Sequence, residues 1–150
     1  MVEKGINTSI LLKRIAKTSD FHLFIKNNEN VMMKKTFFMY LSELCEKNNL
    51  VPEHIIKTAQ IDRTYGHQLF NGTRKPSRDK VIQLAFGFGM TVNETQYLLR
   101  IARKNQLYPK IKRDAAILFC LSKKMGVIDT QNMLESLGLT LLGDDWHHGE

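Results

Sequence analysis

Apolar residues recur at helical spacing along almost the whole chain, and no stretch alternates apolar and polar residues for long enough to predict a strand. The clearest stripe lies in the helix that we expect to begin after Thr36. Its apolar members follow an i, i+3, i+4, i+7 pattern and are Phe37, Phe38, Leu41, Leu44 and Cys45. The spacing therefore predicts an all-α fold.

Capping residues and helix breakers indicate where the helices begin and end. Asp62 and Ser77 are favourable N-caps, Pro52 suits a first helical turn, and Gly72 suits a helix C-terminus. Asp20 caps a short turn, and Asn93 is the expected cap of a later helix. The other predicted helices span 8–17, 36–47, 52–58, 63–71, 78–88, 94–104, 114–124 and 129–137, with residues 27–35 as a linker.

An internal repeat links residues 75–99 to residues 110–134, at a separation of 35. Nine of the 25 aligned positions are identical, and the alignment needs no gap. A single helical hairpin cannot bury its apolar face alone, so we expect the two copies to stack. Convergent patterning of two unrelated hairpins is the alternative. The identical residues of the first copy are Lys75, Arg78, Asp79, Ile82, Met90, Val92, Thr95, Gln96 and Leu99.

The sequence argues against a membrane-spanning protein and against a secreted, cysteine-rich one. No apolar run approaches the roughly 20 residues of a membrane-spanning helix, and the N-terminal residues do not form a signal peptide. Two cysteines, Cys45 and Cys120, are too few for a disulfide framework or a cysteine-rich zinc site. We therefore expect a reduced, cytoplasmic protein that does not associate with membranes.

Residues 60–62 connect the predicted helices 52–58 and 63–71, and so short a connection is typical of a helix-turn-helix. Several segments after residue 37 follow one known pattern: the helix over 52–58, Ile61-Asp62-Arg63-Thr64, Leu69, Asn71-Gly72, Arg74-Lys75-Pro76-Ser77, Leu84-Ala85 and Gly89-Met90-Thr91-Val92. Through these segments, residues 37 to about 103 resemble the Cro- and phage-repressor-type (xenobiotic-response-element, XRE) helix-turn-helix family. The resemblance implies a five-helix repressor-like domain in a bacterial or phage transcriptional regulator, with a recognition helix at 63–71.

Four positions depart from this family's usual pattern. The family usually has a small residue in place of Ile56, glycine in place of Gln60, and a branched apolar residue in place of Gly66. Ile56 is larger than the family's usual residue and Gly66 is smaller, so together they keep the total side-chain volume about the same. We therefore expect Ile56 and Gly66 to pack against each other. Pro52 replaces a polar residue that the family commonly directs to a phosphate.

The predicted helix over 63–71 has an apolar side and a polar side. At 100° per residue, Gly66, Leu69 and Phe70 face inward. The opposite side carries side chains that can reach base edges, and the expected base-reading residues are Arg63, Thr64, His67 and Gln68. The residues that follow supply donors and positive charge for phosphates. The expected phosphate-contacting residues are Asn71, Thr73, Arg74, Lys75, Ser77 and Arg78.

The expected organisation is therefore a repressor-like domain with additions at both ends. Residues 1–35 form a helical extension and linker, 36–104 the DNA-binding domain, 105–142 a hairpin packed on it, and 143–150 a flexible tail. The expected partners are double-stranded DNA and a second copy of the chain, since one short helix reads few base pairs. The C-terminal hairpin is a candidate surface for a protein partner.

A protein-interaction module, of the antitoxin or signalling type, is the alternative function. The departures from the family pattern and the additional hairpin favour it, whereas the retained polar face argues against it. An enzyme is not expected, because no arrangement of nucleophile, base and orienting acid is suggested and no phosphate-binding glycine loop occurs. No metal or other cofactor is expected. His147 and His148, beside Asp144 and Asp145, belong to the expected tail.

Overall fold

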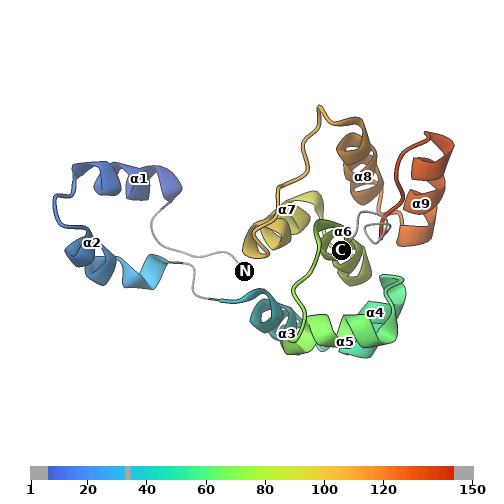
Figure 1. Cartoon of the computed structure of the whole chain (residues 1–150), viewed down its shortest axis with the longest axis horizontal. Coiled ribbons are helices and arrows are strands. Elements are labelled where there is room, and N and C mark those ends of the chain that lie inside the picture. The colour runs from blue at the N-terminus through green and yellow to red at the C-terminus, as the bar shows by residue number, and fades with distance from the viewer. Residues whose placement is uncertain (1–6, 33–34, 144–150) are drawn as a thin grey trace. The chain divides into compact units, whose positions relative to one another are not determined.

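The computed structural model describes residues 7–32 and 35–143, and all regular structure in these ranges is helical (Figure 1). In chain order the elements are α1 (Thr8–Lys17), α2 (Phe21–Asn27), the 3₁₀ helix η1 (Glu29–Val31), α3 (Phe37–Lys47), α4 (Pro52–Thr58), α5 (Arg63–Asn71), α6 (Arg78–Phe88), α7 (Val92–Ile101), α8 (Lys112–Ser122) and α9 (Val127–Ser136). The predicted all-α class is confirmed for these ranges. Within them, no helix is both long and apolar enough to span a bilayer. The chain divides into two units, Met1–Lys34 and Lys35–Glu150.

The N-terminal unit contains two capped helices and one feature that the sequence did not indicate. Asp20 caps α2, as predicted, through a hydrogen bond from the backbone N–H of Leu23. The predicted linker at 27–35 is wrong in part, because η1 lies inside it and Asn28 is buried. Asn28 accepts a hydrogen bond from Arg14 (2.8 Å) and donates one to the carbonyl of Phe24 (2.8 Å). Asn28 can therefore be buried between α2 and η1, because both the oxygen and the nitrogen of its side-chain amide are hydrogen-bonded.

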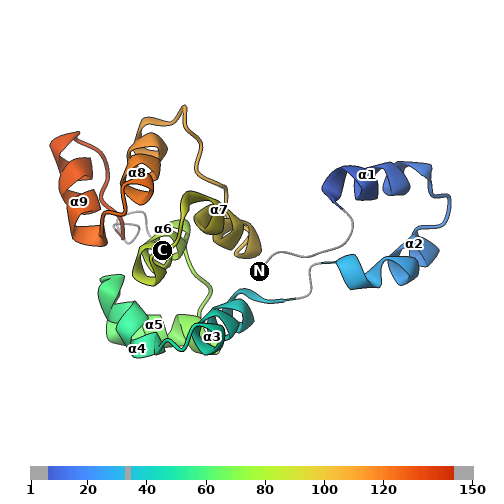
Figure 2. The same cartoon turned by 180° about the vertical axis from the view of Figure 1, so that it is seen from behind.

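Helix α6 lies at the centre of the second unit, with α3–α5 on one side and α7–α9 on the other (Figures 1 and 2). Its residues from Lys80 to Phe86 are all buried, and it contacts α4, α7 and α9. Such burial all round is expected of a helix that is covered by neighbours on several sides. The position of α6 therefore determines how helices α3–α5 and the C-terminal hairpin are held together.

The local signals located the ends of α4, α5 and α6 correctly, but not those of the later helices. The predicted helix 94–104 is instead α7, and Thr91 rather than Asn93 is its N-cap. Thr91 and Glu94 form a reciprocal capping box, which satisfies two backbone donors at once. Helices α8 and α9 each begin two residues before the predicted aspartate, without a side-chain cap. One of those aspartates, Asp114, pairs with an arginine of α6 instead.

The two repeat copies make the same hydrogen bonds at the same separation of 35 residues. Gln96 bonds both the N–H and the carbonyl of Leu107, at 2.8 and 2.9 Å. Its counterpart Gln131 bonds Leu142 in the same way, at 2.7 and 2.8 Å. The equivalence therefore extends to residue 142, beyond the 25 aligned positions, and Leu107 and Leu142 are themselves identical.

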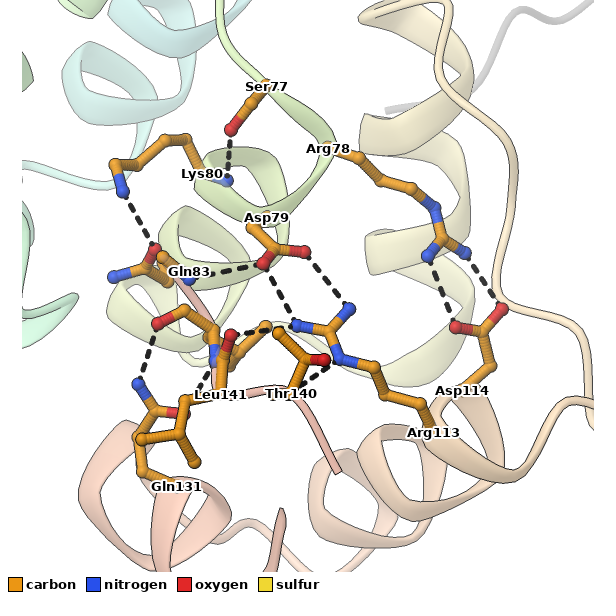
Figure 3. A network of polar contacts seen from close by, with 12 residues as sticks. Ser77, Arg78, Asp79, Lys80, Gln83, Arg113, Asp114, Gln131, Thr140 and Leu141 are labelled. Atoms are coloured by element: carbon orange, nitrogen blue, oxygen red, sulfur yellow. Dashed lines mark hydrogen bonds and ion pairs between the residues drawn. The ribbon is translucent and has the colours of Figure 1, made fainter. Parts of the chain in front are cut away.

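The two copies are joined by a reciprocal exchange of arginine–aspartate pairs (Figure 3). Arg78 donates to both carboxylate oxygens of Asp114, at 2.8 and 3.1 Å. Arg113 donates to both carboxylate oxygens of Asp79, at 2.9 and 3.1 Å. Residues 78 and 79 of the first copy thus meet 114 and 113 of the second, which is the pattern of a two-fold interface. The two hairpins pack as an internal pseudo-dimer.

Backbone groups complete each of these two pairs in the same way. Arg78 also donates to the carbonyls of residues 105 and 106, and Arg113 to those of residues 140 and 141. Asp114 accepts from the N–H of Tyr108 (2.9 Å), and Asp79 from the N–H of Gly143 (3.1 Å). Every one of these partners has its equivalent 35 residues away. A buried ion pair needs such additional hydrogen bonds to offset its loss of water.

Helices α4 and α5 dock through the predicted complementarity of Ile56 and Gly66. A Cβ atom added to Gly66 would overlap Cγ2 of Ile56 and lie 2.7 Å from its Cγ1, so a larger residue fits there only if Ile56 shifts. Gln60, in the turn between the helices, has φ of 60°, which is the left-handed conformation that glycine adopts more readily. The expected packing of Ile56 against Gly66 is confirmed.

The Ile56–Gly66 contact predicts a non-additive pair of substitutions. Gly66→Val is expected to cost about 1–3 kcal/mol by overpacking, and Ile56→Ala about 2–5 kcal/mol by leaving a cavity. The double variant should recover most of this loss, because the new side chain fills the vacated volume. Urea unfolding followed by circular dichroism measures the three free energies. Additive losses would contradict the proposed docking.

The reciprocal pairs predict a large loss when one partner is removed. Asp114→Ala leaves the Arg78 guanidinium without its carboxylate, and we expect a loss of about 3–5 kcal/mol in the free energy of unfolding. Asp79→Ala, the equivalent change, should give a comparable loss. Replacing the whole pair, Arg78→Met with Asp114→Leu, should be milder than Asp114→Ala alone. Losses below about 1 kcal/mol, as for exposed pairs, would show that the exchange is not structural.

Candidate nucleic-acid interface

Helix α5 is held so that one side is buried and the other is open. Asp62 caps its N-terminus by accepting from the N–H of Tyr65 (3.1 Å), and Gly72 ends it with φ of 85°. Gly66, Leu69 and Phe70 are buried, as the helical spacing predicted. The opposite side of the helix therefore faces away from the core.

The four expected base-reading residues all lie along the outward side of α5. Arg63 and Thr64 in the first turn are exposed, and His67 and Gln68 in the second turn are half-buried. Arginine, threonine and glutamine carry donors and acceptors that match base edges in the major groove. The structure thus brings these four side chains together on one short, polar surface.

Two of these residues are paired with an acid that the sequence did not single out. Glu53, in the first turn of α4, accepts from Arg63 Nε (2.9 Å), and its other oxygen lies 2.6 Å from His67 Nε2. The hydrogen bonds from His67 and then Arg63 hold the pKa of Glu53 below its usual range. The carboxylate therefore stays charged and orients both side chains.

Gln68, another of the expected base-reading residues, contacts the loop that follows α5. Arg74 donates through Nε to Gln68 Oε1 (3.0 Å), and its backbone N–H donates to the Gln68 carbonyl (3.2 Å). The Arg74 guanidinium also lies 4.3 Å from the centre of the Tyr65 ring. Stacking of this kind holds a cation over an aromatic face. Tyr65 thus positions Arg74, a role that the sequence gave no signal for.

The loop between α5 and α6 presents most of the expected phosphate-contacting residues. Thr73, Arg74 and Lys75 are exposed. Asn71 Oδ1 accepts from the N–H of Thr73 (2.8 Å), and Ser77 caps α6 by accepting from the N–H of residue 80 (3.3 Å). The N-terminus of α6 therefore lies next to this loop, and a helix N-terminus favours anions.

Arg78 is the one expected phosphate contact that the structure assigns elsewhere. Its guanidinium bonds Asp114 and two backbone carbonyls, and 27% of its side chain is exposed. We therefore remove Arg78 from the set of phosphate-contacting residues. Asp79 is likewise paired with Arg113, so its negative charge is compensated beside the loop.

A metal site finds no support in the described part of the chain, where no three His, Cys, Asp or Glu side chains are grouped to hold an ion. His147, His148 and the rest of the expected tail, 144–150, lie outside the described residues. The polar surface on α5 and the loop after it form the candidate site.

Comparisons with protein-family models, curated proteins and solved structures gave no match to this chain. The resemblance to the XRE helix-turn-helix family consequently stays a prediction that rests on the residues quoted above.

Proposed function

We propose that this protein is a sequence-specific DNA-binding transcriptional regulator that inserts α5 into the major groove. The observation that carries the proposal is the outward side of α5, where Arg63, Thr64, His67 and Gln68 share one surface. Helix α4 supports this surface from behind through the Ile56–Gly66 contact. A short capped helix with a polar face, braced by a second helix, is what groove reading requires.

The phosphate backbone would be held by the loop after α5. Thr73, Arg74, Lys75 and Ser77 supply hydroxyl groups and positive charge, and the N-terminus of α6 adds the helix dipole. Asn71 lies at the junction of the helix and this loop. Such contacts set the register of the protein on DNA, whereas base contacts set its sequence preference.

Binding requires that contacts in the free protein be exchanged for contacts to DNA. Glutamine reads adenine with both its carbonyl and its amide group, but Gln68 Oε1 accepts from Arg74 in the free protein. We infer that Arg74 turns from Gln68 to a phosphate when DNA binds. Arg63 and His67 must similarly exchange their contacts with Glu53. One short reader also implies a homodimer on two half-sites.

The alternative function, a protein-interaction module, is favoured by one specific observation. Glu53 already satisfies Arg63 and His67, and an acid on this surface opposes the approach of phosphates. In that case the same polar face would recognise a protein. A regulator would select DNA with two defined half-sites, whereas an interaction module would select no DNA sequence.

The deciding experiment is the selection of bound sites from a random duplex library at two salt concentrations. A sequence-specific regulator yields a motif with two spaced half-sites, and binding persists at the higher salt concentration. Binding without sequence preference that falls steeply with salt indicates only a basic surface. Absence of binding at low salt would overturn the proposal in favour of the interaction module.

Substitutions in the two parts of the site should have different effects. Gln68→Ala should lower the preference for the selected site over altered sites by about 1–3 kcal/mol, because a base contact is lost. Lys75→Ala should weaken binding to all duplexes alike and reduce the slope of log affinity against log salt by about 1. Fluorescence anisotropy with matched duplexes measures both. Equal effects of the two changes would contradict the assigned roles.

Removal of Glu53 should separate affinity from discrimination. In Glu53→Ala, Arg63 and His67 lose the group that orients them, and a negative charge leaves the surface. We expect binding to unrelated duplexes to strengthen several-fold and the preference for the selected site to fall. Glu53→Gln, which keeps an acceptor without the charge, is the matched control. A variant that loses affinity for every duplex would show that Glu53 itself contacts DNA.

A further inference from the structure

The pseudo-dimer of the two hairpins allows their surfaces to be compared position by position. On α6, Gln83 Nε2 donates to the carbonyls of Ala59 (3.1 Å) and Gln60 (3.3 Å), at the C-terminal end of α4. A Cβ atom added to Gly87 would lie 2.7 Å from the carbonyl oxygen of Ile55. Helix α4 is therefore seated directly on this side of α6.

The same side of α8 is open to solvent. The residues 35 positions after Gln83 and Gly87 are Leu118, which is half-buried, and Ser122, which is exposed. Phe119 is 46% exposed, although its counterpart Leu84 is fully buried. The hairpin thus repeats the face that takes a helix in the first copy, but among the described residues of the second unit no helix is seated on it.

The exposed side of α8 carries an apolar stripe at helical spacing. Ile111 precedes the helix and is 51% exposed, and Ala115, Leu118 and Phe119 follow at i+4, i+7 and i+8. This is the spacing with which one helix packs along another. We call these four residues the α8 stripe.

Positive charge flanks the α8 stripe at both ends. Lys112 and Lys123 are exposed, and Lys123 Nζ lies 5.7 Å from the centre of the Phe119 ring. Asp114, the only acidic residue of α8, is buried and paired with Arg78. The exposed charge of α8 is therefore entirely positive, which complements an acidic partner and opposes a second copy of the same face.

We propose that the α8 stripe is the docking surface for an amphipathic helix of a partner protein, whose apolar side is flanked by Asp or Glu. The seating of α4 on α6 is the internal precedent, and the lysines select for acidic flanks. Ser122 in place of Gly87 keeps the partner's backbone farther from α8 than α4 is from α6. The surface uses none of the residues assigned to DNA, so this inference does not rest on the proposed function.

The test is a fluorescence anisotropy titration of the full chain with a labelled synthetic helix. The probe carries leucine at i, i+3, i+4 and i+7 and glutamate elsewhere, and a second probe has lysine in place of every glutamate. We expect saturable binding of the glutamate probe only. Phe119→Ser should weaken this binding about tenfold or more. Ile128→Ser, at another exposed apolar residue that lies on α9, should leave it unchanged.

A charge-reversed variant distinguishes a lost contact from a misfolded chain, because it should gain binding to one probe rather than only lose binding. Lys112→Glu with Lys123→Glu alters only exposed residues, and it should transfer the preference from the glutamate probe to the lysine probe. Equal binding of both probes to the unaltered chain would overturn the proposal. So would a dimer in sedimentation that Phe119→Ser dissociates, because a second copy would then be the occupant. DNA site selection with Phe119→Ser should remain unchanged.

Discussion

The exchange of Arg78 and Asp79 with Asp114 and Arg113 is the constraint on which the arrangement of the second unit depends. The observed stacking of the two hairpins gives each guanidinium group a carboxylate and each carboxylate two guanidinium donors. Such pairs add little net stability over apolar packing, but a wrong stacking would leave buried charges unpaired. In this protein the exchange therefore specifies the position of the C-terminal hairpin.

This constraint reaches the candidate site through α6. The helix begins with the two paired residues, continues into the side on which α4 is seated, and is preceded by the loop that we assign to phosphates. Because Arg78 and Asp79 are paired internally, the free charge of the loop comes from Arg74 and Lys75. The electrostatics of the site are thus set partly by a contact between two hairpins that lie outside it.

Local features of the sequence predicted much of this structure, and contacts between helices account for what they missed. The caps Asp62 and Ser77 and the C-terminal Gly72 fixed the ends of α5 and α6, because each interaction spans only a few residues. Ile56 and Gly66 could be paired because they depart together from a known pattern. The roles of Glu53 and Tyr65 depend on how α4, α5 and the loop cross. Spacing along one helix carries no information on that geometry.

The repeat also shows why equivalent residues need not have equivalent roles. The two copies share their arginine–aspartate pairs and their glutamine contacts, which hold each hairpin in shape and join it to the other. They differ at Gln83 and Gly87, where α4 is seated, and at their counterparts Leu118 and Ser122. The arginine, aspartate and glutamine positions that shape and join the hairpins are therefore the same in both copies, whereas the two positions that meet α4 differ. The first hairpin braces α4, whereas the second carries the side of α8 that we propose as a docking surface.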